Sequence, residues 1–68
     1  MAEFNREALT QALRSINSLL DKCEKVQRKF NAGTSQHTLL KNRIEALRIA
    51  SALIAREIEE QDRKADEA

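Results

Sequence analysis

The sequence has no proline, tryptophan or tyrosine, and it has one glycine, one cysteine and one histidine. A lone cysteine excludes a disulfide within the chain, and one cysteine with one histidine cannot supply the ligand set of a structural zinc site. A chain of 68 residues buries only about 60% of the surface that it exposes when unfolded. Because disulfides and zinc are excluded, association with another chain is the remaining source of stability.

The sequence also has no apolar run of about 18 residues that would span a bilayer. The first residues, Met-Ala-Glu-Phe-Asn-Arg-Glu, lack the basic and then apolar order of a secretion signal. We therefore expect a cytoplasmic protein that makes no membrane contact. No catalytic, cofactor-binding or metal-binding pattern is present, so we expect a non-enzymatic protein with no cofactor and no metal.

What the sequence does contain is a helical repeat of apolar residues. Over about residues 3–30 these recur at alternating intervals of three and four, which predicts an amphipathic helix with one buried side. The repeat comprises Leu9, Ala12, Ile16, Leu19, Cys23, Val26 and Phe30. Cys23 belongs to this repeat, and we expect it to be buried as a small apolar residue rather than to act as a reactive thiol.

The only glycine marks the end of this helix. Gly33 suits the left-handed backbone that often ends a helix, and Thr34 or Ser35 can cap the helix that follows. A loop confined to residues 31–34 predicts that the second helix, about residues 35–62, runs antiparallel to the first. The acidic tail, residues 63–68, has nothing to bury, and we expect it to fray. The chain is thus interpreted as one all-α helical-hairpin domain, residues 1–68.

The second helix carries more apolar surface than one neighbour can cover. One stripe comprises Leu40, Ile44, Leu47, Ile54 and Ile58, and an adjacent stripe comprises Leu39, Ala46, Ile49, Ala50 and Leu53. Together they span about 220°, whereas a helix at the surface of a core shows a stripe of little over about 100°. We therefore predict that two hairpins dimerise into a four-helix bundle, or that the hairpin binds another helical protein. The predicted interface residues are Leu39, Ala46, Leu47, Ile49, Ala50, Leu53 and Ile54.

Charge is divided between the two ends of the predicted hairpin, although the net charge is only +1. Residues 22–48 carry a net charge of +5, from seven Lys and Arg against two Glu, and residues 49–68 carry −3, from three against six acids. An alternative function is therefore a small nucleic-acid-associated regulator that uses the basic loop end. Its candidate contacts are Lys22, Lys25, Arg28, Lys29, Lys41 and Arg43.

Two resemblances bear on function. The segment GTSQHTLLKNRI at residues 33–44, with KCEK at residues 22–25, resembles a set of short uncharacterised bacterial proteins. That resemblance covers about residues 9–54 and implies a helical hairpin in a bacterial cytoplasm, without an activity.

The second resemblance is to two-helix phosphatases that act on sporulation response regulators, whose second helix opens with Ser-Gln-x-Leu-Asp. In this chain Ser35-Gln36 is followed by His37-Thr38-Leu39, so the leucine and the acidic residue of that motif are missing. An enzyme based on His37, with Ser35 and Gln36, is the third functional alternative. The other interpretation of His37 is a neutral side chain in the first turn of a helix, where the helix dipole disfavours the imidazolium.

Overall fold

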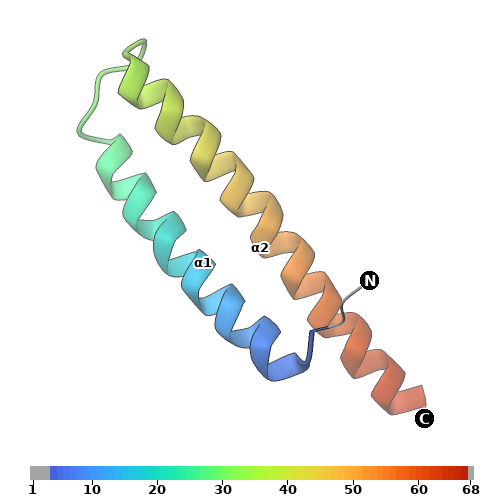
Figure 1. Cartoon of the computed structure of the whole chain (residues 1–68). Helices are drawn as coiled ribbons and strands as arrows, with labels where there is room; N and C mark the ends of the chain where they lie inside the picture. The colour runs from blue at the N-terminus through green and yellow to red at the C-terminus, as the bar shows by residue number, and fades with distance from the viewer. Residues whose placement is uncertain (1–3, 68) are drawn as a thin grey trace.

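A computed structural model describes residues 4–67, and the chain in it forms two helices joined by a short loop. The helices are α1 (Arg6–Gln27) and α2 (Ser35–Glu67). Figure 1 shows that they lie side by side and antiparallel, with the start of α1 and the last turns of α2 at the end opposite the loop. The molecule is a rod of 52 × 19 × 18 Å. The predicted all-helical hairpin is confirmed, and the described residues contain no strand.

Asn5 begins α1. Its side-chain oxygen accepts a hydrogen bond from the N–H of Ala8 at 2.8 Å, which satisfies one of the free donors of the first turn. The helix ends at Gln27, earlier than the predicted residue 30. There the N–H groups of Lys29 and Phe30 donate to the carbonyls of Val26 and Gln27, at 3.0 and 3.1 Å. These bonds span three residues instead of four, and they tighten the chain out of the α-helix.

The loop follows the local signals in the sequence. Gly33 has a φ of 92°, in the left-handed region where a Cβ is disfavoured. Thr34 is the residue that caps α2, since its hydroxyl accepts the N–H of His37 at 3.2 Å. The same hydroxyl donates to the carbonyl of Asn31 at 2.9 Å. Of the two predicted caps, the structure uses Thr34.

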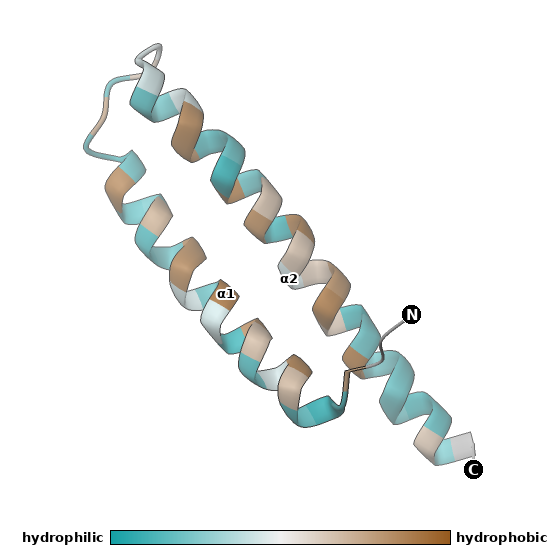
Figure 2. Ribbon diagram, viewed as in Figure 1, coloured by the Kyte–Doolittle hydropathy of each residue, from teal (hydrophilic) through white to brown (hydrophobic). Residues whose placement is uncertain are grey.

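The second helix is longer than expected, because α2 continues to Glu67 instead of fraying from residue 63. Near this end α2 contacts the start of α1, since the Gln61 amide donates to the Phe4 carbonyl at 2.9 Å and Arg6 pairs with Asp62. Both contacts lie within the predicted helix. The polar turns beyond them appear teal in Figure 2 and begin with an ion pair inside α2, in which Arg63 lies 3.2 Å from Glu60. Residue 68 lies outside the described residues.

The core lies between the two helices and is small. Among the described residues, Leu9 and Ile44 are its two buried hydrophobic residues, at 8% and 4% exposure. Half-buried residues surround them along the inner sides of both helices, and Figure 2 shows the apolar stretches recurring along each ribbon. The main half-buried apolar residues are Ala12, Leu13, Ile16, Leu20, Cys23, Leu40, Leu47, Ile54 and Ile58. The first predicted stripe of α2 is therefore the one that faces α1.

The inner side of α1 differs from the predicted repeat. Leu19, Val26 and Phe30 are 51%, 40% and 37% exposed. Leu13 and Leu20 are half-buried instead. Leu9, Ile16 and Cys23 of the repeat lie on the inner side as predicted. The buried side of α1 is therefore displaced toward Leu13 and Leu20, and an apolar strip of α1 stays in solvent.

Candidate interaction face

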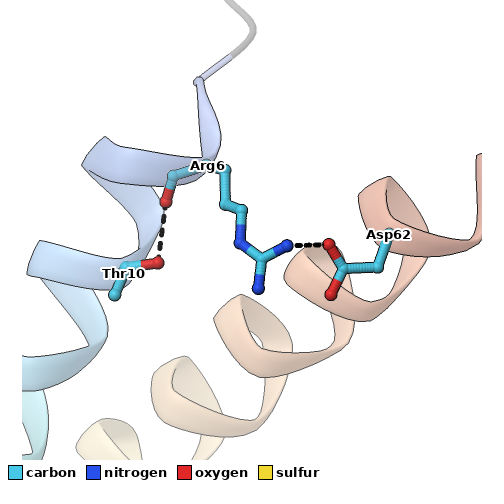
Figure 3. Close-up of polar contacts among 3 residues, drawn as sticks. All are labelled: Arg6, Thr10 and Asp62. Carbon is cyan, nitrogen blue, oxygen red and sulfur yellow. Dashed lines mark hydrogen bonds and ion pairs between the residues drawn. The ribbon is translucent and has the colours of Figure 1, made fainter. Parts of the chain in front are cut away.

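Polar side chains join the two helices along one edge of the hairpin. The Ser51 hydroxyl donates to the side-chain oxygen of Asn17 at 2.8 Å. The Arg48 guanidinium lies 3.3 Å from the Glu24 carboxylate. Figure 3 shows the third pair, in which Arg6 reaches across from α1 to Asp62 on α2. These pairs are partly exposed and contribute little to stability, but they fix the register of the two helices.

The opposite edge of α1 is apolar. Two residues after Arg6, Asn17 and Glu24 come Ala8, Leu19 and Val26. Two residues correspond to about 200° of rotation around a helix, so these three lie almost opposite the polar side chains. All three are exposed.

The corresponding edge of α2 is apolar as well. Leu39, Ala46 and Leu53 recur every seven residues and are exposed, and Ala46 precedes Arg48 by two. Because the ion pairs hold the polar edges of the helices together, the two apolar edges lie on the same side of the hairpin. We name this surface the apolar face. Its residues are Phe4, Ala8, Ala12, Leu19, Val26, Phe30, Leu39, Ala46, Ala50 and Leu53.

The apolar face is hollowed near the start of α1. A notch of about 200 Å³ opens there, and its wall is almost entirely apolar. It is lined by Phe4, Ala8, Leu9, Ala12 and Ile54. The notch exists because the alanines leave space between two helices that carry larger side chains elsewhere. Phe4 at its rim is 63% exposed.

The structure divides the predicted interface residues into two groups. Leu39, Ile49 and Leu53 are 52%, 58% and 55% exposed. Ala46 is exposed and Ala50 half-buried, so both are accessible from the same side. The other two, Leu47 and Ile54, lie half-buried on the stripe that faces α1.

Sequence reasoning missed the contribution of α1 to this surface. Leu19 and Val26 were assigned to the contact with the second helix, yet both are exposed. One signal was present. The apolar arc of α1 is wider than a single neighbouring helix needs, because Leu13 and Leu20 flank the repeat. A wide arc indicates a second contact on α1, as it does on α2.

The candidate nucleic-acid contacts are all exposed. Lys22 and Lys25 lie three residues apart on the outer side of α1, away from α2, and Lys29 follows in the turn after the helix. Lys25 also pairs with Asp21 at 3.0 Å. Lys41 lies on the other helix, beside Gln27. Arg28, in the turn after α1, and Arg43, on α2, complete the set.

The residues of the enzyme alternative lie in the first turn of α2. His37 is half-buried beside exposed Ser35 and Gln36, and its backbone N–H is used by the Thr34 cap. Cys23 is a free, half-buried cysteine. Among the described residues there is no group of three or more His, Cys, Asp or Glu side chains that could hold a metal ion.

Comparison with known protein families, with curated proteins and with solved structures finds no match to this chain. Within the described residues, neither helix combines the length and the apolar character needed to cross a bilayer. The inferences about function therefore depend on the geometry of the two helices.

Proposed function

We propose that this protein is a non-enzymatic helical module that works by self-association, and that two copies bury their apolar faces against each other in an antiparallel four-helix bundle. The observation that carries the proposal is the distribution of exposed leucines. Leu19, Leu39 and Leu53 are each more than half exposed, and all three lie on the same side of the hairpin. Monomeric proteins rarely leave a contiguous surface of this kind in water.

The small core supports the same proposal. Leu9 and Ile44 are the buried hydrophobic residues of the described chain. The hairpin alone therefore has little apolar burial to offset the entropy of folding. A second copy would cover the half-exposed residues of both helices at once. Burial of a leucine or isoleucine contributes about 1.5–3 kcal/mol relative to full exposure. Folding and association of the chain are therefore expected to be coupled.

Charge complementarity favours a second copy as the occupant of the face. The loop end of the hairpin is basic, with +5 over residues 22–48, and the open end is acidic, with −3 over residues 49–68. Two copies related by a twofold axis across the rod place the basic end of each beside the acidic end of the other. An unrelated partner would need a matching charge pattern of its own.

The proposal is tested by a charged residue on the apolar face. We expect Leu53→Asp to convert the protein from dimer to monomer, or to unfold it, because the carboxylate would be desolvated at the contact. Ala52→Asp is the matched control, since Ala52 is exposed on a different side of the same helix. Light scattering gives the mass, and circular dichroism gives the helix content. Equal effects of the two substitutions would contradict the proposal.

A further inference from the structure

The sizes of the residues on the α1 side of the apolar face are arranged symmetrically about Leu19. Ala8 and Phe30 each lie eleven residues from Leu19, and Ala12 and Val26 each lie seven residues from it. Ala8 and Ala12, before Leu19, are small, whereas Val26 and Phe30, after it, are large. When two antiparallel copies of α1 cross at Leu19, each alanine meets a large side chain. Such alternation of large and small residues packs without voids.

The α2 side of the face has a centre of its own between Ile49 and Ala50. Ala46 and Leu53 lie on either side of this point at equal distances, so two antiparallel copies of α2 place Ala46 of one against Leu53 of the other. Here too a small residue faces a large one.

The pairing of the two helices places Leu19 of α1 and the point between Ile49 and Ala50 of α2 at the same position along the long axis of the hairpin. Asn17, two residues before Leu19, accepts the hydrogen bond of Ser51, which lies just after the α2 centre. Arg6 and Asp62 pair in the same register further along the rod. A single twofold axis that passes beside Leu19 and beside Ala50 therefore places small residues against large ones on both helices.

This axis brings the loop end of one copy to the notch of the other. Phe30, 37% exposed, lies in the turn that follows α1, four residues after Val26. This end of the hairpin comes to the level of Ala8 of the second copy. The notch that Ala8 lines measures about 200 Å³. An apolar cavity of about 150 Å³ is large enough to hold benzene, so the notch has room for the phenyl ring.

From this geometry we infer that the second copy binds with its loop at the opposite end of the bundle, and that Phe30 of each copy occupies the notch lined by Phe4, Ala8, Ala12 and Ile54 of the other. The inference rests on the proposed self-association and adds the register of the two copies and the contact of Phe30 with the notch. The charge division agrees with it. A bundle with both loops at the same end would place like charges side by side, which disfavours that arrangement.

Single cysteines report the orientation directly. In a Cys23→Ala background, which removes the native thiol, Leu19→Cys places two thiols beside the twofold axis, and a short bismaleimide is expected to link most of the protein into covalent dimers. Ser18→Cys is the matched control, because Ser18 is exposed on the outer side of α1 and is expected to give little product. Both products are read on a denaturing gel.

Phe30→Cys in the same background separates the two orientations. With loops at opposite ends, the two thiols lie about 30 Å apart, from a rise of 1.5 Å per residue, and do not link. A mixture of the Phe30→Cys and Ala8→Cys proteins then gives a mixed dimer. Linked Phe30→Cys homodimers, without a mixed product, would overturn the inference.

The mass of the unmodified protein distinguishes a wrong orientation of the dimer from the absence of self-association. A dimeric mass together with linked Phe30→Cys homodimers means that the chain self-associates in the other orientation. A monomeric mass without product from any variant removes the self-association and the inference together. In addition, Phe30→Ala is expected to raise the dimer dissociation constant about tenfold or more, as truncation of an aromatic anchor in a pocket does.

Discussion

Two adjacent leucines on α1 provide a matched test of the two surfaces that the structure assigns to this helix. Leu19 belongs to the apolar face and is 51% exposed in the hairpin, whereas Leu20 is half-buried on the side of α2. The two side chains are chemically identical, and their directions differ by about 100° around the helix axis. Replacement of each by alanine therefore separates association from packing within the hairpin.

For Leu19→Ala the expected loss is in association. Full burial of a leucine is worth about 1.5–3 kcal/mol, and about half of that remains to be gained, which is roughly 1 kcal/mol per copy. Two copies lose roughly 2 kcal/mol, so the dimer dissociation constant should rise about 30-fold. Sedimentation equilibrium over a concentration series measures this change.

For Leu20→Ala the expected loss is in the hairpin itself. Truncation of a packed leucine costs about 2–5 kcal/mol, with the low end appropriate for a half-buried site. Urea denaturation at one high protein concentration should show a lower midpoint for Leu20→Ala than for Leu19→Ala. If the two variants had the same midpoint and the same dissociation constant, the assignment of faces on α1 would be refuted.

Other predictions concern the loop and the basic end. Thr34→Ala should cost about 1 kcal/mol of stability because it removes the helix cap, while Ser35→Ala should cost much less; thermal unfolding compares them. Gly33→Ala should also cost about 1–2 kcal/mol in thermal unfolding, from the backbone alone, because a Cβ at Gly33 would meet no atom within 4 Å. Labelled duplex DNA or RNA should show no salt-dependent binding. Affinity that falls steeply with salt, and falls further in Lys22→Ala and Lys25→Ala, would instead support the nucleic-acid alternative.

Much of the fold follows from short-range signals. Gly33 and Thr34 end one helix and start the next through contacts within a few residues of themselves, so the sequence is enough to locate the loop. The apolar period predicts both helices for the same reason. The end of α2 could not be located in this way, because residues 63–67 are helical but continue no apolar period, and the period was the signal used to place the helix end.

The candidate site was predictable only on α2. The period separates the two stripes of α2, and the outer stripe contains Leu39, Ala46, Ala50 and Leu53 of the apolar face. The edge of the buried side of α1 was not predictable, because Leu13, Leu19 and Leu20 all fit an apolar arc that is wider than one contact. In the structure Leu13 and Leu20 are half-buried and Leu19 is exposed, and the hydrogen bond between Asn17 and Ser51 holds the helix in this orientation.

The most direct measurement of the central claim is the mass of the wild-type protein by light scattering over a wide concentration range. The account predicts a particle of twice the 7.8 kDa of one chain, helical throughout, that dissociates or unfolds only on strong dilution. A helical, cooperatively folding particle with the mass of one chain at the highest concentration would contradict it, since the leucines of the apolar face would then remain in water.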